Sequence, residues 1–217
     1  MEKFSFIFLR HGESEANLKD IFQGQSESNL TERGKMQVSL LGERWKAEGR
    51  QFDAIISSPL LRAKQTAEII QQKLNCPLEL DPVWKERDTG KLTGMNRQDY
   101  FNSDLYHDFF TPYQSMGEIG ESDFELFLRG GRALDSLLKR NTGDYLVVSH
   151  GGLLNQVLHV IIGTTPQANG QGITFRLVNT GFAELRYDPC NYKWTLISFN
   201  DYAHLSTNDV DRNILEL

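Results

Sequence analysis

Two histidines occupy the same kind of position in this sequence, close to the end of a short apolar run and directly before a glycine. The first run, residues 4–9, is followed by Arg10 and His11, and the second, residues 145–149, is followed by His150. Such runs are typical of strands buried on both faces of a parallel sheet. Because α/β proteins bind ligands at the carboxyl ends of parallel strands, we expect the two imidazoles to face each other there. Two imidazoles beside an arginine favour an active site over two structural histidines.

Arg62 is a second residue whose position indicates chemistry. It follows Ser58 and Pro59, which are a typical N-cap and a typical first residue of a helix. A cation in the first helical turn opposes the helix dipole, so stability alone does not favour arginine there. Free N–H groups at a helix start combine with a guanidinium to favour a phosphate group. The sequence therefore predicts an anion site around Arg62.

Other classes of catalytic site lack their sequence patterns here. The chain has no His-x-x-x-His pair, and Cys76 and Cys190 form no CxxC motif, so we expect no metal site. It has neither a Walker A loop nor Gly-x-Gly-x-x-Gly, and Gly-x-Ser-x-Gly is also absent. We expect no cofactor. A histidine nucleophile remains as the chemistry that the residues support.

The composition limits the partners and the domain organisation. The chain has 217 residues and a formal net charge of -6, which argues against a nucleic-acid partner. No apolar run is long enough to span a bilayer, so we expect no membrane partner. The sequence begins directly with the first strand and has no secretory signal, so the prediction is a cytoplasmic protein of one domain over 1–217. The oligomeric state is left open.

The remaining patterns predict an α/β fold. Further strands are expected at 52–56 and 78–80, and from residue 173 onward at 174–178, 183–187 and 194–199. Short turns separate these last strands, so we expect a mostly parallel sheet with an antiparallel end. Helical patterns begin at Thr31, Ser58, Ser122 and after His150.

A segment rich in aromatic residues interrupts this pattern near 95–120. It has no clean helical or strand period, and it contains tyrosines and phenylalanines together with Pro112 and Gly117. We expect a flap insertion over the pocket, or equally an insertion packed on a small core of its own. Glu86, in a charged loop before this segment, is a candidate proton donor.

An ordered set of motifs resembles the phosphoglycerate mutase-like branch of the histidine phosphatase superfamily along nearly the whole chain. The motifs are LRHGES at 9–14, LTERG at 30–34, SSPLLRA at 57–63, Glu86, GES at 120–122 and SHGG at 149–152. The resemblance implies a three-layer α/β/α sandwich and a phosphomonoesterase that acts on a small phosphorylated metabolite without a metal.

The resemblance also implies roles for individual residues. His11 is then the nucleophile that becomes phosphorylated, and Glu86 is the proton donor. The phosphoryl oxygens are bound by Arg10, Arg62 and His150. Further substrate-binding residues are expected at Asn17, Gln23, Gly24, Arg87, Arg97, Gly151 and Asn179.

Two alternative functions remain open on the sequence. Glu86-Arg87 and the glycines that follow resemble the cofactor-dependent phosphoglycerate mutases, with Arg97 where those carry a lysine. Thr89, however, stands where they have a tyrosine, and their adjacent arginine pair is absent before Gly120. Hydrolysis is therefore preferred to isomerisation of 2- and 3-phosphoglycerate. A non-catalytic phosphate-binding regulatory module is the second alternative, against which the complete set of His11, Glu86 and His150 argues.

Overall fold

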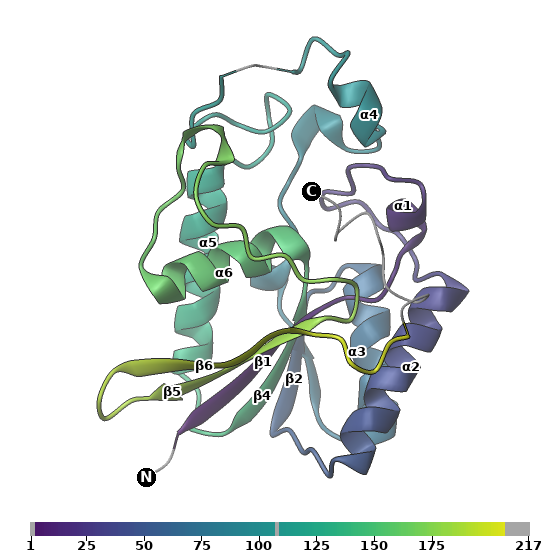
Figure 1. Ribbon diagram of the computed structural model, residues 1–217, viewed down its shortest axis with the longest axis vertical. Coiled ribbons are helices and arrows are strands. Elements are labelled where there is room, and N and C mark those ends of the chain that lie inside the picture. Colours follow the sequence, from purple (N-terminus) through teal and green to yellow (C-terminus); the bar gives the residue numbers. More distant parts are fainter. Residues whose placement is uncertain (1–2, 107–108, 207–217) are drawn as a thin grey trace.

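A central β-sheet organises the molecule in the computed structural model, which describes residues 3–106 and 109–206 (Figure 1). Within these residues the sheet has six strands in the order β3-β2-β4-β1-β5-β6. The strands are β1 (Phe4–Arg10), β2 (Ala54–Ser57), β3 (Leu78–Leu80), β4 (Asp144–Ser149), β5 (Phe182–Asp188) and β6 (Lys193–Asp201). The first four are mutually parallel, and β5 and β6 run antiparallel. The predicted mostly parallel sheet with an antiparallel end is confirmed.

Two pairs of long helices cover the two faces of this sheet (Figure 1). One face carries α2 (Glu32–Ala47) and α3 (Leu61–Leu74), and the other carries α5 (Asp123–Leu138) and α6 (Gly151–Ile162). The short elements are α1 (Glu15–Leu18), α4 (Arg97–Tyr100) and the 3-10 turns Pro82–Trp84, Gly90–Leu92 and Ala168–Gly170. The three-layer α/β/α sandwich implied by the resemblance is therefore confirmed.

The strand period divides the core into two clusters. Along β1, Phe6 and Phe8 point to the side of α5 and α6, whereas Ile7 and Leu9 point to the side of α2 and α3. Trp45 fills the second cluster and is fully buried. A strand that is apolar on both faces is thus explained by a helix layer on each side.

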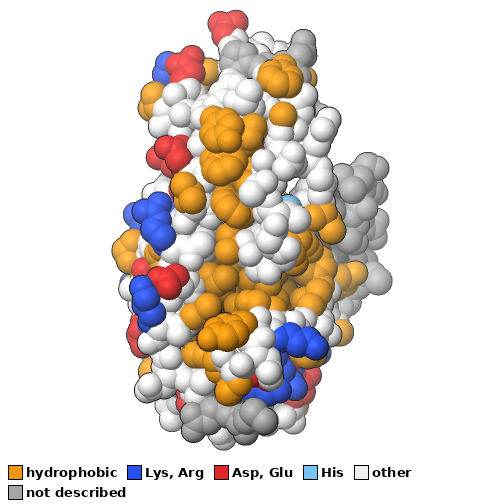
Figure 2. Space-filling model, turned by 90° about the vertical axis from the view of Figure 1, so that its left-hand side faces the viewer, with side chains coloured by type: hydrophobic (Ala, Val, Ile, Leu, Met, Phe, Trp, Pro, Cys, Tyr) orange, Lys and Arg blue, Asp and Glu red, His pale blue; other side chains and the backbone are white. Residues whose placement is uncertain are grey.

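The antiparallel end of the sheet is less covered. Figure 2 shows the side of the molecule that lies at the left of Figure 1, where apolar side chains gather in a band along the long axis. Exposed apolar side chains include Leu128 of α5, Ile162 of α6 and Leu196 of β6. β6 is an edge strand, and most of its side chains are at least partly exposed.

Two local predictions were wrong. Residues 174–178 form no strand, because side-chain amides bind their backbone: Phe175 N donates to Asn155 Oδ1 and Val178 N to Asn200 Oδ1. The helix expected to begin after Ser58 begins at Leu61 instead. Leu60 is the N-cap residue in place of Ser58, whose hydroxyl accepts a hydrogen bond from Leu60 N at 3.3 Å and lies 2.8 Å from Nε2 of His150.

Candidate active site

The carboxyl ends of β1, β2 and β4 meet at one edge of the sheet and carry the predicted site. β1 and β4 are neighbours in register, with Arg10 opposite Ser149, so His11 and His150 emerge side by side. Their ring centroids lie 5.1 Å apart. A cavity of about 500 Å³ opens above this edge. All predicted site residues except His150 and Asn179 line it.

His11 is held as a neutral imidazole. Its Nδ1 lies 2.7 Å from the carbonyl oxygen of Gly12, which can only accept a hydrogen bond, so Nδ1 carries the proton and Nε2 keeps its lone pair. Burial lowers the pKa of His11 well below its ordinary value, and the nearby charges of Arg62 and Arg10 lower it further. The ring therefore has the protonation state and the free nitrogen that a nucleophile needs.

His150 lies behind His11 and is fully buried. It is the N-cap residue of α6, and its Nε2 lies at hydrogen-bond distance from Ser58 Oγ. Its Nδ1 is buried and has no hydrogen-bond partner among the described residues. Burial first, and then the charge of Arg62, lowers the pKa of His150 well below its ordinary value. The role of His150 in binding a phosphoryl group stays a prediction.

Two arginines supply the positive charge of the cavity floor. Arg62 is 1% exposed and donates to the carbonyl oxygens of Ser26 (2.9 Å) and Gly24 (2.8 Å). Arg10 donates to the carbonyl oxygen of Leu177 at 2.7 Å. Among the described residues no carboxylate forms an ion pair with Arg62, so its charge remains available to an anion.

The carboxylate of Glu86 is held against the start of α6. It accepts hydrogen bonds from the backbone N–H groups of Arg87 (2.8 Å), Gly152 (3.1 Å) and Leu153 (3.2 Å). A Cβ atom at Gly152 would lie only 2.6 Å from Glu86 Oε1. Glycine at this position thus lets the carboxylate approach the helix terminus and face the cavity.

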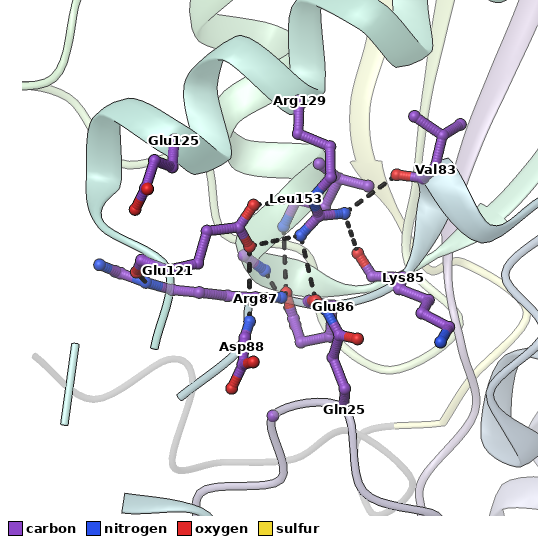
Figure 3. A network of polar contacts seen from close by, with 12 residues as sticks. Gln25, Val83, Lys85, Glu86, Arg87, Asp88, Glu121, Glu125, Arg129 and Leu153 are labelled. Carbon is purple, nitrogen blue, oxygen red and sulfur yellow. Dashed lines mark hydrogen bonds and ion pairs between the residues drawn. The ribbon is translucent and has the colours of Figure 1, made fainter. Parts of the chain in front are cut away.

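Arg129 of α5 holds the loop that carries Glu86, although it was not among the residues predicted for the site. Its guanidinium donates to the carbonyl oxygens of Val83 (2.9 Å), Lys85 (2.5 Å) and Glu86 (3.1 Å). It also forms a two-point ion pair with Glu121, at 2.8 and 2.7 Å (Figure 3). The only sequence signal was the GES motif that contains Glu121, because Arg129 itself lies in an ordinary helix pattern.

The loop after His11 is organised by its own side chains. Asn17 Oδ1 accepts a hydrogen bond from the backbone N–H of Ser14, and the single hydroxyl proton of Ser14 is shared between Asn17 Oδ1 at 2.9 Å and Gln23 Oε1 at 3.0 Å. Gly24 has a φ of +50°, and its carbonyl orients Arg62. Asn17, Gln23 and Gly24 line the cavity, and Ser14 is buried behind them.

Asn179 lies behind the cavity lining, and its role as a substrate-binding residue stays a prediction. It does not line the cavity, and its side-chain amide donates to the carbonyl oxygen of His11 at 2.9 Å. It therefore fixes the backbone of His11 from behind.

We call the exposed charged residues of the lining, Asp20, Arg97 and Arg176, the mouth of the cavity. Arg87 donates to Glu121 O and forms an ion pair with Asp123, whereas Arg97 stacks on Phe22 with its Cζ 4.6 Å from the ring centroid. Three further lining residues, Asp20, Asn155 and Arg176, were not foreseen. Arg176 was not predicted as a site residue because residues 174–178 were expected to form a strand.

The aromatic segment near 95–120 lies beside this site. Arg87 and Met116 line both the active-site cavity and a neighbouring one of about 720 Å³. Tyr100 and Tyr106 line the neighbouring cavity and contact each other edge to face. Within this segment residues 107 and 108 lie outside the described part, and its movement as a flap stays a prediction.

In the described ranges, no group of three or more His, Cys, Asp or Glu side chains is arranged to hold a metal ion. No helix within those ranges combines the length and apolar character needed to cross a bilayer.

A sandwich with two histidines and two arginines at one sheet edge defines a phosphate-handling α/β enzyme. Residues 6–202 match the model of the histidine phosphatase superfamily (branch 1), and the chain belongs to this family. A metal-independent phosphoserine phosphatase of Arabidopsis thaliana is 34% identical over 213 residues, which cover 95% of this chain and 85% of the plant protein.

Mutases are among the relatives as well. A 2,3-bisphosphoglycerate-dependent phosphoglycerate mutase of Methylobacterium is 34% identical over 170 residues, covering 74% of this chain and 82% of the mutase. Among solved structures, a phosphoserine phosphatase mutant of Entamoeba histolytica in complex with phosphoserine has a TM-score of 0.75 and 25% identity, covering 94% of this chain and all of that one (100%). The predicted enzyme class, a histidine phosphatase with a mutase as the alternative, is confirmed.

Proposed function

We propose that this protein hydrolyses a small phosphomonoester through a phosphohistidine on His11. The observation that carries the proposal is the state of that ring: Nδ1 is tied to Gly12 O, Nε2 is free, and Arg10 and Arg62 flank the cavity floor. A buried neutral imidazole beside two cations is suited to attack a phosphorus atom that bears negative oxygens.

In the first half-reaction, Nε2 of His11 forms a bond to phosphorus while the bond from phosphorus to the ester oxygen breaks. Arg10 and Arg62 stabilise the charge that spreads over the equatorial oxygens. The carboxyl group of Glu86 gives its proton to the departing ester oxygen, so an alcohol leaves. Donors of this kind each contribute roughly 3 kcal/mol by analogy with oxyanion holes.

In the second half-reaction, water attacks the phosphohistidine. Glu86, now a carboxylate, takes a proton from the water as its oxygen bonds to phosphorus, and the bond to Nε2 breaks. Inorganic phosphate leaves, His11 is again neutral, and Glu86 again carries its proton. Each carboxyl and imidazole group returns to its starting state, so no cofactor is consumed.

The mouth of the cavity supports a substrate with an acidic group besides its phosphate. Arg97 and Arg176 belong to it, and both are more exposed than Arg10 and Arg62. The plant relative is named for phosphoserine, and we extend that class, a small phosphorylated acid, to this protein. The adjacent arginine pair of the mutases is absent before Gly120, which supports transfer to water rather than to a second phosphoglycerate.

The test follows inorganic phosphate and 2-phosphoglycerate together. Purified protein is given phosphoserine, 3-phosphoglycerate with and without 2,3-bisphosphoglycerate, and p-nitrophenyl phosphate. We expect phosphate release from phosphoserine and from the nitrophenyl ester, abolished in His11→Ala. Rapid isomerisation that depends on the bisphosphate would establish the mutase activity instead. Absence of turnover of every ester would favour the non-catalytic phosphate-binding module.

A further inference from the structure

Asp20 is an unexpected residue for an anion-binding cavity. Among the described residues that line the cavity, Asp20 and Glu86 are the only carboxylates. Glu86 has a place in the proton transfers, but Asp20 does not. A negative charge at this position repels a phosphate dianion. A carboxylate here is suited to pair with a cation of the substrate or of the protein.

Arg97 is a partner of Asp20, but it uses only part of the carboxylate. Arg97 Nε lies 3.3 Å from Asp20 Oδ1, and the two side chains are 54% and 55% exposed. In the described part of the chain, Asp20 Oδ2 and the two terminal nitrogens of Arg97 have no hydrogen bond. Arg97 is held by stacking on Phe22, so its terminal nitrogens remain available to a ligand.

Arg176 adds a second cation to the same mouth. It lines the cavity from residues 173–178, it is exposed, and none of its side-chain nitrogens pairs with a described residue. The segment is held in place by hydrogen bonds that its backbone N–H groups donate to the side-chain oxygens of Asn155 and Asn200. The mouth thus has one carboxylate and two arginines, above a floor of Arg10, His11 and Arg62.

We infer that this mouth recognises a zwitterion: Asp20 binds the ammonium group of a phosphorylated α-amino acid, and Arg97 and Arg176 bind its carboxylate. Phosphoserine carries both groups on one carbon, a single methylene from the ester oxygen, so both stay near the mouth when the phosphoryl group is on the floor. The Asp20–Arg97 pair then opens to accept one charge on each side. This inference rests on the proposed phosphatase activity. It adds the residues that distinguish a phosphorylated amino acid from other phosphate esters.

The experiment compares phosphoserine with 3-phosphoglycerate, which has a hydroxyl in place of the ammonium group. The ratio of their kcat/KM values is measured for the wild-type protein and for Asp20→Asn. We expect the ratio to fall about tenfold or more, because the ammonium loses an ionic partner while the phosphoglycerate loses a repulsive charge. Glu15→Gln removes an equal charge from a side chain of α1 that lies outside the cavity lining, and should leave the ratio unchanged.

A second pair of substrates tests the carboxylate site. Arg176→Gln should lower kcat/KM for phosphoserine about tenfold relative to phosphoethanolamine, which lacks the carboxylate. Ratios that stay within twofold of wild type in Asp20→Asn and Arg176→Gln would overturn the inference, while turnover of p-nitrophenyl phosphate keeps the phosphatase proposal intact. No turnover of any ester by the wild-type protein would overturn that proposal and this inference with it.

Discussion

Replacement of Arg129 by Gln tests how the proton-transfer residue is positioned. Arg129 lies outside the cavity lining, and it acts through the backbone of residues 83–86. Gln keeps part of the side-chain length but cannot bridge three carbonyl oxygens and the carboxylate of Glu121 together. The change therefore releases the Glu86 loop while the phosphate-binding floor stays intact.

The expected loss of stability follows from the burial of this ion pair. Arg129 and Glu121 are each 15% exposed, so removal of the arginine leaves a poorly solvated carboxylate and three carbonyl groups without their donor. Breaking a buried pair in this way costs about 3–5 kcal/mol. For a chain of this size the melting temperature should fall by roughly 6–20 °C. Thermal unfolding followed by circular dichroism measures it.

The expected loss of activity depends on the leaving group. Displacement of the Glu86 carboxyl by about 1 Å should lower kcat for phosphoserine about a hundredfold. The nitrophenyl ester needs little protonation, so its kcat should fall far less, and KM should change little for either. Both are assayed below the melting temperature of the variant. Arg132→Gln, an exposed arginine of the same helix, is the control.

Equal losses of kcat on both esters would refute this reasoning. They would mean that Arg129 supports the stability of the fold in general and does not position the Glu86 carboxyl group. A variant with wild-type melting temperature and turnover would refute it as well.

Three further predictions concern the site itself. Glu86→Gln should lower kcat for phosphoserine about a hundredfold or more but that for p-nitrophenyl phosphate within about tenfold, and equal losses would argue against an acid role. Gly152→Ala should reduce kcat for phosphoserine with the fold retained by circular dichroism, since the new Cβ would meet Glu86 Oε1, and wild-type kcat would contradict this. NMR titration should find His11 and His150 neutral at pH 6, because their pKa values lie well below the ordinary one. Unfolded histidines bind protons below about pH 6.5, so these two residues should lower stability as the pH falls. Titration of both rings near 6.5 would contradict the burial argument.

The sequence predicted the core of the site because its signals are local. A buried strand followed by His-Gly indicates a site at the carboxyl end of that strand. Both such strands, β1 and β4, belong to one parallel sheet. The adjacency of β1 and β4 depends on the strand order, and that order is determined by packing of the helices on both faces. Sequence periodicity carries no information on that step.

The residues that were missed act across long sequence separations. Arg129 contacts the Glu86 loop from α5. The spacing of apolar residues in that helix indicates only which face is buried. Asp20 and Arg176 come to one cavity mouth from opposite ends of the chain. Neither lies in a motif, so only their positions in space distinguish them from surface charges.

The errors at 174–178 and at the start of α3 have a common physical cause. In both places a polar side chain replaced the expected secondary-structure partner. Asn155 and Asn200 accept hydrogen bonds from the backbone of the predicted strand, and the Ser58 hydroxyl contacts His150 as well as Leu60 N, ahead of a helix that begins at Leu61. Strand and cap propensities describe local preferences, and tertiary hydrogen bonds override them.

Detection of the phosphoenzyme tests the central claim most directly. The protein is mixed rapidly with phosphoserine, quenched in alkali to preserve phosphohistidine, digested and sequenced by mass spectrometry. We predict one phosphoryl group on His11, formed within a single turnover, and none in His11→Ala. Phosphoserine turnover with no modified histidine, or with the phosphoryl group on another residue, would contradict the account.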